Sequence, residues 1–169
     1  MSPNEPPAAM VLKQIGTIRT PYPEPAGTPL GGSTAEGACA TVWIEEPYRE
    51  ALKDLEGFDT VWLVYWFHRS RPGEAVVTPF KDTVPRGLFA TRAPSRFNPI
   101  GISAVRLLAV YADRIEVEGV DIVDGAPLLD IKPYIPQYDS WPESRTGWFE
   151  QAHRSAKVAD GRFAKADGE

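Results

Sequence analysis

Phe58-Asp59-Thr60-Val61-Trp62-Leu63-Val64-Tyr65-Trp66-Phe67 carries β-branched and aromatic residues on both faces of one continuous run. Residues of these kinds fit a pleated strand, and apolar side chains on both faces are typical of a strand that is covered on both sides. We therefore predict a central β-strand at residues 58–67. Trp62 and Trp66 share one face of it, and we expect them to pack in the core or at a subunit contact.

Strand patterns continue on both sides of this run. Residues 38–44 alternate with the period of two that a strand requires. Ala112-Asp113 is predicted to form a tight hairpin turn between two further strands. The predicted strands cover residues 12–20, 38–44, 58–67, 75–78, 87–91, 102–111, 114–120 and 128–131.

Helical patterns are confined to two short segments, residues 47–55 and residues 146–157. Because several short strands follow one another with almost no helix between them, we expect a mainly β fold. Its predicted form is a small antiparallel β-barrel with few short helices and a C-terminal helix, rather than a Rossmann sheet. Residues 21–37 hold four prolines and four glycines, and a loop of this length in a compact domain is functional or disordered.

The composition restricts the class of protein. A single cysteine, Cys39, excludes an internal disulfide framework and fits a reducing cytosol, so we expect a cytoplasmic protein. His68 and His153 are the only histidines, and we expect no metal site. No apolar run approaches the ~20 residues that span a bilayer. Residues 1–10 lack the basic and then apolar pattern of a signal peptide.

The charge is unevenly distributed along the chain. The formal net charge is −5, but residues 68–106 hold seven Lys or Arg against two acidic residues, a balance of +5, which leaves −10 for the remainder. A basic segment on an acidic protein favours local binding of an anion over an extended nucleic-acid face. The alternative is that these arginines are scattered over the surface of a barrel.

Common catalytic motifs are absent from the sequence. There is no G-x-G-x-x-G opening a helix, no G-x-x-x-x-G-K-[ST] phosphate loop and no G-x-S-x-G nucleophile elbow. The usual routes to a dinucleotide, nucleotide or acyl enzyme are therefore closed.

The run 87–101 begins as a strand and then breaks at two prolines, an asparagine and a glycine. These residues specify a loop, from which Arg92 and Arg96 offer planar donors suited to carboxylate or phosphate. The amide of Asn98 is placed to bond a ligand edge. Alternatively, Arg92 pairs with a carboxylate such as Asp130 and Asn98 caps a turn.

The run 123–134 has the same character. Asp130 lies between apolar neighbours, Lys132 follows on the same strand face, and Tyr134 is next if the strand continues. A charged pair in an apolar strand is either paired structurally or used by a site. His68, at the end of the aromatic strand, is likewise a hydrogen-bonding plug or a functional base or ligand.

Two runs identify a resemblance. Phe-Ala-Thr-Arg-Ala-Pro-Ser-Arg-Phe-Asn-Pro-Ile-Gly at 89–101, followed by Ser103, and Asp-Gly-Ala-Pro-Leu-Leu-Asp-Ile-Lys-Pro-Tyr-Ile-Pro at 124–136 resemble the two signatures of the TrmO (TsaA-like) β-barrel RNA methyltransferases. Residues 15–22 resemble the opening strand of that family, and Phe67-His68 resembles the end of its middle strand. The likeness covers residues 12–139. Phe97 departs from the pattern, because the family usually has proline there.

The resemblance implies a small antiparallel barrel that forms a homodimer. It also implies that S-adenosylmethionine is used to methylate N6 of threonylcarbamoyl-adenosine beside the tRNA anticodon. The residues that would contact the cofactor are Pro29, Leu30, Gly31, His68, Arg69, Arg92, Ile102, Ile122, Val123, Asp124 and Gly125.

Methyl transfer to this nitrogen also requires that its proton leaves. We expect Asp130 or Asp124 to accept that proton or to orient the substrate, with Lys132 and Tyr134 holding the substrate. Arg92 would bind the carboxylate of the cofactor or of the substrate. The basic segment, with Arg86, Arg96 and Asn98, would contact the anticodon loop of tRNA.

Two other functions stay open at the level of sequence: methylation of a small molecule with the same cofactor, and a non-catalytic binding or interaction protein on the same barrel. The expected organisation is a flexible N-terminal tail at residues 1–11, the barrel domain at residues 12–139 and a helical tail at residues 140–169. No membrane partner is expected.

Overall fold

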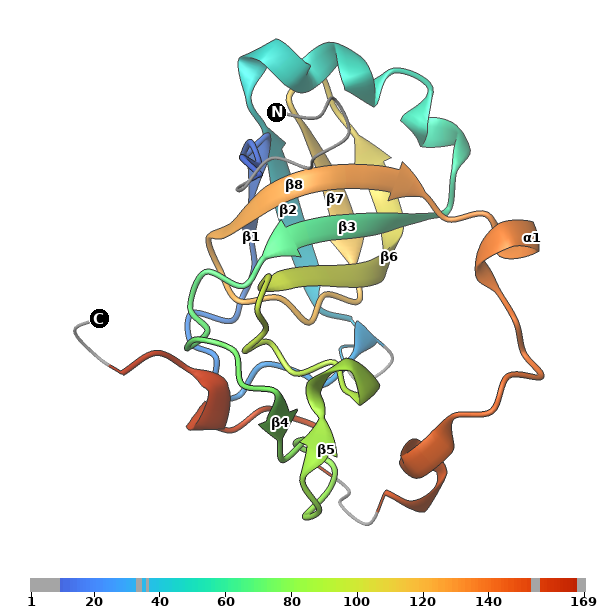
Figure 1. The fold of residues 1–169 in the computed structure, drawn as a ribbon. Helices are drawn as coiled ribbons and strands as arrows, with labels where there is room; N and C mark the ends of the chain where they lie inside the picture. The colour runs from blue at the N-terminus through green and yellow to red at the C-terminus, as the bar shows by residue number, and fades with distance from the viewer. Residues whose placement is uncertain (1–9, 33–34, 36, 153–155, 167–169) are drawn as a thin grey trace, which may run out of the picture.

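A computed structural model of the chain describes residues 10–32, 35, 37–152 and 156–166. Six strands close into a barrel in the order β1-β2-β7-β6-β3-β8, with every neighbouring pair antiparallel (Figure 1). The prediction of a small antiparallel β-barrel is confirmed. The barrel strands are β1 (Gly16–Arg19), β2 (Cys39–Ile44), β3 (Thr60–Trp66), β6 (Ile100–Val110), β7 (Arg114–Glu118) and β8 (Ala126–Pro133).

The interior of the barrel holds the main apolar core. On β3, Val61, Leu63 and Tyr65 point inward and are buried. Trp62 and Trp66 alternate with them on the outer face and are half-buried, because successive side chains of a strand face opposite sides. Neither tryptophan therefore packs in the barrel core, and their burial at a subunit contact remains a prediction.

The hairpin between β6 and β7 is confirmed. The amide of Tyr111 donates to the carbonyl of Arg114 at 2.8 Å, which closes the turn over Ala112-Asp113.

The strand predicted at residues 87–91 is wrong. Only Arg86–Gly87 (β5) is extended, paired with Val76–Val77 (β4), and the 3-10 helix η4 (Leu88–Ala90) follows. The amide and hydroxyl of Thr91 both donate to the carbonyl of Leu88, which turns the chain out of the strand.

The helices are short. Residues 47–55 form the 3-10 helices η2 (Glu46–Leu52) and η3 (Leu55–Gly57), and the only α-helix of the described residues is α1 (Pro136–Asp139). The single helix predicted at residues 146–157 is wrong. Its start is the 3-10 helix η5 (Gly147–Gln151), and Gly147 has φ of 59°, which a regular right-handed helix does not accept.

Some sequence predictions fall outside the described residues. These include residues 1–9 of the predicted flexible tail, residues 153–155 of the predicted helix, and residues 167–169. Across the described part of the chain, no helix has the length and apolar character that crossing a membrane requires.

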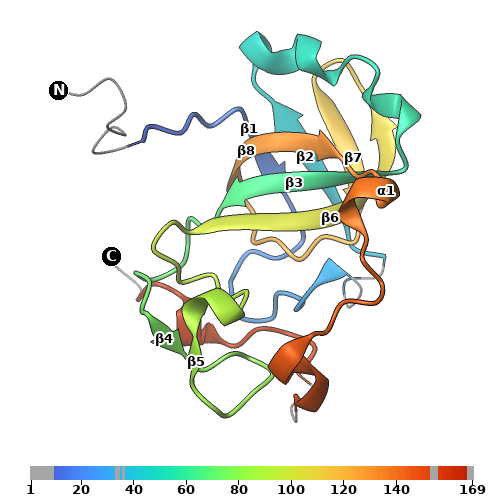
Figure 2. The same cartoon turned by 45° about the vertical axis from the view of Figure 1, so that its right-hand side comes forward.

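A second, smaller apolar cluster lies below the barrel, at β4, β5 and the C-terminal segment (Figures 1 and 2). Its buried members are Val77, Leu88, Ala93 and Phe163, and Phe80 packs edge-on against Phe163 with ring centroids 5.0 Å apart. Phe163 belongs to the 3-10 helix η6 (Gly161–Phe163). Residues close to the C-terminus therefore complete this core.

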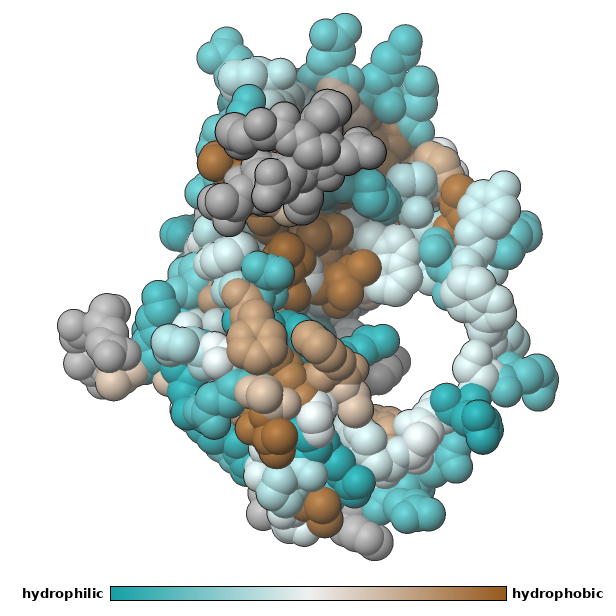
Figure 3. Space-filling view, in the orientation of Figure 1, coloured by the Kyte–Doolittle hydropathy of each residue, from teal (hydrophilic) through white to brown (hydrophobic). Residues whose placement is uncertain are grey.

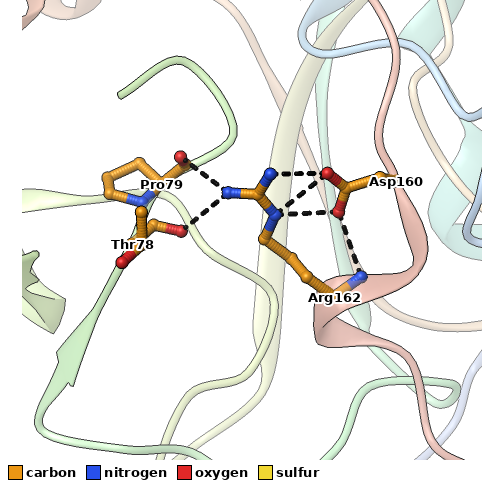
Figure 4. Close-up of polar contacts among 4 residues, drawn as sticks. All are labelled: Thr78, Pro79, Asp160 and Arg162. Atoms are coloured by element: carbon orange, nitrogen blue, oxygen red, sulfur yellow. Dashed lines mark hydrogen bonds and ion pairs between the residues drawn. The ribbon is translucent and has the colours of Figure 1, made fainter. Parts of the chain in front are cut away.

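The C-terminal segment is also bound through its backbone and by Arg162. Val158 pairs with Pro29 and Ala164 pairs with Ser70 as isolated antiparallel bridges. The guanidinium of Arg162 binds Asp160 at 2.6 Å and donates to the carbonyls of Thr78 and Pro79 at 3.3 and 3.1 Å (Figure 4). The segment thus fastens the long loop 20–37 and the loop that follows β3.

The chain between α1 and η5 arches away from the barrel. Figure 3 shows an opening between this arch and the body of the molecule. The lower end of the arch is fixed by Trp148, whose indole Nε1 donates to the carbonyl of Ala90 at 2.7 Å.

Candidate functional site

An open pocket of about 480 Å³ lies where β6 and β7 separate. The two strands pair only between Arg106 and Val110 of β6, so nearer its start β6 borders the segment that follows β7. The volume lies within the range of small-molecule sites. Among the residues that line the pocket are Gly31, Gly32, Trp62, Arg92, Ile102, Ser103, Arg106, Glu118, Gly119 and Asp121.

The long loop approaches the barrel closely at Gly32. A Cβ at this position would lie 2.9 Å from the carbonyl oxygen of Gly119 and 3.4 Å from that of Ala104. The absence of a side chain therefore lets the loop border the pocket. Gly31 beside it has φ of 101°, a left-handed conformation that favours glycine.

A buried chain of hydroxyls ends at a carboxylate in this pocket. Ser103 Oγ donates to Asp121 Oδ1 at 2.6 Å and lies 3.2 Å from Tyr65 Oη. Because the single hydroxyl proton of Ser103 is directed at Asp121, Tyr65 is the donor in the second contact. The hydrogen-bonded chain therefore runs from Tyr65 through Ser103 to Asp121.

Burial makes Asp121 and Tyr65, two members of this chain, weaker acids than usual. Burial raises the pKa of Asp121, while the hydrogen bond from Ser103 and the positive charge of Arg92 act in the opposite direction. Burial and the charge of Asp121 raise the pKa of Tyr65 well above its ordinary value, so the phenol stays protonated. Asp121 is thus more basic than an ordinary aspartate.

Gly101, the last residue of the 89–101 signature, makes room for Tyr65. A Cβ at Gly101 would overlap the ring of Tyr65, including its Oη at 2.8 Å. The glycine therefore allows the phenol to lie against β6 and reach Ser103.

Asp124 holds the turn that leads into β8. Its Oδ1 accepts the amide of Thr20 at 2.9 Å, and its Oδ2 lies 3.4 Å from the guanidinium of Arg19. Gly125, with φ of 77°, donates its amide to the carbonyl of Ile18. Ile122 is buried and its carbonyl accepts the hydroxyl of Thr20 at 2.8 Å. These contacts fix the predicted cofactor run 122–125, including half-buried Val123, against the end of β1.

His68 lies next to this turn. A Cβ at Gly125 would be 3.9 Å from His68 Nε2. Burial, followed by the charges of Arg69 and Lys165, lowers the pKa of His68, although hydrogen bonds to the backbone of Trp66 and Asp124 partly oppose this. The imidazole is therefore neutral at neutral pH. Arg69 itself is bound to Glu24 at 2.6 Å.

The other predicted cofactor residues lie in two places. Arg92 and Ile102 are exposed and line the pocket together with Gly31. Pro29 and Leu30 are held by the C-terminal segment. Pro29 pairs with Val158, and the amide of Leu30 donates to the carbonyl of Lys157 at 2.9 Å.

Asp130, Lys132 and Tyr134 share the outer face near the pocket. Lys132 Nζ lies 2.7 Å from Asp130 Oδ2; the side chain of Lys132 is largely exposed and that of Asp130 is half-buried. In the sheet Lys132 is opposite Trp62, a pocket residue, and the rings of Trp62 and Tyr134 are 5.5 Å apart. The predicted pairing of Asp130 with Lys132 on one strand face is present.

Two of the three predicted RNA-contacting residues stabilise their own loops. Arg96 donates to the carbonyls of Thr91 and Ala93 at 3.0 and 3.3 Å. Arg86 binds the buried carboxylate of Asp82 at 2.7 Å, which lowers the pKa of that carboxyl group. Asn98 is exposed, and its carbonyl accepts the amide of Ile100 in a turn.

Asp121 was not predicted from the sequence, and Ser103 was predicted only as part of a signature. The sequence did contain a signal for Asp121, because this acid lies between the apolar residues Val120 and Ile122. Both neighbours are almost fully buried, and an acid in such a setting needs a partner or a function. Among the described residues, no group of three or more His, Cys, Asp and Glu side chains is placed to hold a metal ion.

Fold and pocket together define the class: a six-stranded antiparallel barrel with a glycine-bordered pocket at the separation of two strands. The family model of the tRNA-methyltransferase O N-terminal domain matches residues 17–140. The chain belongs to this family, and the resemblance stated from the sequence is confirmed.

Individual relatives agree with this membership. A protein of Pyrococcus abyssi (strain GE5 / Orsay), named a probable S-adenosyl-L-methionine-binding protein, is 42% identical over 159 residues, which are 93% of this chain and 86% of that protein. The tRNA (adenine(37)-N6)-methyltransferase of Escherichia coli (strain K12) is 33% identical over 151 residues, 83% of this chain and 64% of that enzyme.

Solved structures match the fold as well. A crystal structure of TrmO superposes with a TM-score of 0.72 at 38% identity, covering 82% of this chain and 64% of the solved one. The TrmO structure from Pseudomonas aeruginosa gives a TM-score of 0.70 at 36% identity, covering 82% and 62%. The chain therefore spans less than two thirds of these TrmO structures and of the E. coli enzyme.

Proposed function

We propose that this protein is an S-adenosylmethionine-dependent tRNA methyltransferase that methylates N6 of threonylcarbamoyl-adenosine next to the anticodon. Family membership supports the cofactor and the class of reaction. The observation that carries the proposal is the pocket itself, where Gly31, Arg92 and Ile102 meet at the separation of β6 and β7.

The cofactor site extends from this pocket along the run 122–125. Backbone of the long loop at Pro29, Leu30 and Gly31 borders one side, and residues 122–125, fixed by Asp124, border the other. His68 is next to Gly125 and is neutral, so it offers a hydrogen bond to the cofactor without repelling the positive sulfonium. Arg69 completes this end of the site.

Arg92 supplies an exposed cation of the pocket, in addition to Arg106, which is paired with Glu118. Its guanidinium is suited to bidentate binding of a carboxylate, which both the cofactor and a threonylcarbamoyl group carry. On the neighbouring outer face, Asp130, Lys132 and Tyr134 are placed to contact the substrate. Orientation of donor and acceptor in line is the main contribution that such a site makes to methyl transfer.

The polynucleotide would approach across the basic segment 68–106 and contact Arg86 and Asn98, and Arg96 orders the loop that presents Arg92. A nucleotide beside the anticodon is single-stranded, so its base reaches the pocket with little unpairing. We further propose that the barrel forms a homodimer, with the outer face of Trp66 at the contact, and that the protein is cytoplasmic.

Labelled methyl transfer tests this function. The purified chain is incubated with methyl-labelled S-adenosylmethionine and with tRNA that carries or lacks the threonylcarbamoyl group. The proposal expects label only in the modified tRNA. Label in small metabolites without tRNA would instead support a small-molecule methyltransferase, and binding of the cofactor with no transfer to any acceptor would support a binding protein.

A further inference from the structure

Among the described residues, two carboxylates, those of Glu118 and Asp121, line the pocket, and their surroundings differ. Glu118 forms an ion pair with Arg106 at 3.3 Å. Asp121 accepts a short hydrogen bond from the neutral hydroxyl of Ser103. It also accepts a hydrogen bond from the backbone of Gly31 in the long loop. Asp121 is therefore the carboxylate that lies between Gly31 of the long loop and the start of β6.

We propose that Asp121 is the catalytic base that accepts the proton of the methylated nitrogen. This assignment deepens the proposed function and rests on it. In the step, the nitrogen forms a bond to the methyl carbon while the methyl–sulfur bond breaks and its electron pair stays on sulfur. The N–H proton passes to the carboxylate of Asp121, and the products are the methylated nucleoside, S-adenosylhomocysteine and a neutral carboxylic acid.

The other aspartates near the site are less suited to this step. Asp124 accepts the amide of Thr20 with one oxygen and faces Arg19 with the other. Asp130 likewise accepts the amide of Ile131 with Oδ1 and pairs with Lys132 through Oδ2. Both of these carboxylates are engaged by a cationic side chain, and neither of them lines the pocket.

Asp121 combines basicity with a fixed position. Burial raises its pKa, which makes its carboxylate a stronger proton acceptor. The hydrogen bond from Ser103 and the charge of Arg92 act against this rise. Once the proton has arrived, the acid is neutral in a half-buried place, where loss of its charge is favourable.

Ser103 and Tyr65 are positioning residues for this base. Ser103 fixes Asp121 Oδ1 at 2.6 Å, and the phenol of Tyr65, held against Gly101, orients the serine hydroxyl. Removal of the serine hydroxyl retains the carboxylate of Asp121 but withdraws one of the contacts that lower its pKa.

The test compares Asp121→Asn with the matched control Asp113→Asn, whose carboxylate pairs with Arg114 in the β6–β7 hairpin and does not line the pocket. Single-turnover methyl transfer to threonylcarbamoyl-bearing tRNA is measured, together with cofactor binding by calorimetry. We expect Asp121→Asn to slow transfer by about 10²–10⁴-fold with little change in cofactor affinity, while the control retains the wild-type rate.

A pH profile separates catalysis from structure. The charged and titratable groups around Asp121 are Arg92, Tyr65, Arg106 and Glu118. We expect the wild-type rate to rise with pH through a single ionisation, and Ser103→Ala to move this midpoint to higher pH because a contact that lowers the pKa of Asp121 is lost.

Transfer by Asp121→Asn at the wild-type rate, or an unchanged pH midpoint in Ser103→Ala, would overturn the assignment while leaving the proposed function in place. Absence of methyl transfer by the wild-type chain would overturn the proposed function and the assignment of Asp121 with it.

Discussion

The hydroxyl of Ser103 lies 2.6 Å from the carboxylate of Asp121 and joins β6 to the segment that follows β7. The strands themselves pair no further than Arg106, so this side-chain contact continues the barrel wall where the backbone ladder stops. The pocket opens beside the contact. One hydrogen bond therefore serves the closure of the barrel and the position of an acid in the site.

Gly101→Ala tests the support of this contact. The added methyl group would overlap the ring of Tyr65, which is buried and cannot move aside freely. We expect a loss of about 1–3 kcal/mol in the free energy of unfolding, measured by urea denaturation. Gly57→Ala is the control, because no atom lies within 4 Å of its Cβ position, and a change within about 0.5 kcal/mol is expected for it. Equal stabilities of the two variants would contradict the packing described.

Arg92→Ala tests an exposed cation of the pocket. Loss of a charged, bidentate donor is expected to weaken binding of the carboxylate-bearing ligand by at least about tenfold. Calorimetry with S-adenosylmethionine, and KM for tRNA, show which of the two ligands Arg92 binds. Arg92→Lys is expected to recover only part of the loss, since it retains the charge without the planar donor pair. Wild-type values for both ligands in Arg92→Ala would exclude this role.

The sequence was sufficient for the barrel and for part of the site. Period-two alternation in β2 and the apolar run of β3 predicted strands correctly, because alternation reports directly on which side chains are buried. The proline and glycine pattern of the 89–101 signature correctly marked a loop, and Arg92 and Ile102 from this region do line the pocket.

The sequence could not show contacts between distant segments. Ser103 and Asp121 meet where the backbone pairing of β6 and β7 has ended, and this point depends on the three-dimensional course of both strands. The predicted helix at 146–157 failed for a related reason: its residues satisfy a helical pattern, but Gly147 has a left-handed φ and the chain is fixed by Trp148 on Ala90. Tertiary contacts here override local preference.

Phe163→Ala tests the fastening of the C-terminal segment. Phe163 is 3% exposed and packs against Phe80, so its truncation is expected to cost about 3–5 kcal/mol. Because this segment also holds Pro29 and Leu30 by backbone contacts, weaker cofactor binding is expected as well. Val158→Ala, with half of its side chain exposed, is the control. Thermal denaturation and calorimetry measure both effects, and unchanged stability in Phe163→Ala would refute the fastening.

The lowered pKa of His68 predicts a dependence of stability on pH. Protonation is less favourable in the folded chain than in the unfolded chain, whose ordinary value is 6.5. The contribution of His68 is therefore fully present above pH 6.5 and is lost as the pH falls toward the lowered folded value. We expect His68→Gln to lose less stability than wild type between pH 7 and pH 5, measured by urea denaturation. Identical slopes in the two proteins would contradict the burial of a neutral imidazole.

The central claim is methylation of a modified adenosine in tRNA, and the most direct measurement uses total tRNA from cells with and without the threonylcarbamoyl-forming enzymes. The chain and labelled S-adenosylmethionine are added, and the tRNA is digested to nucleosides. The account predicts label in N6-methylated threonylcarbamoyl-adenosine from the first tRNA and none from the second. Equal labelling of both tRNAs, or label in neither, would contradict it.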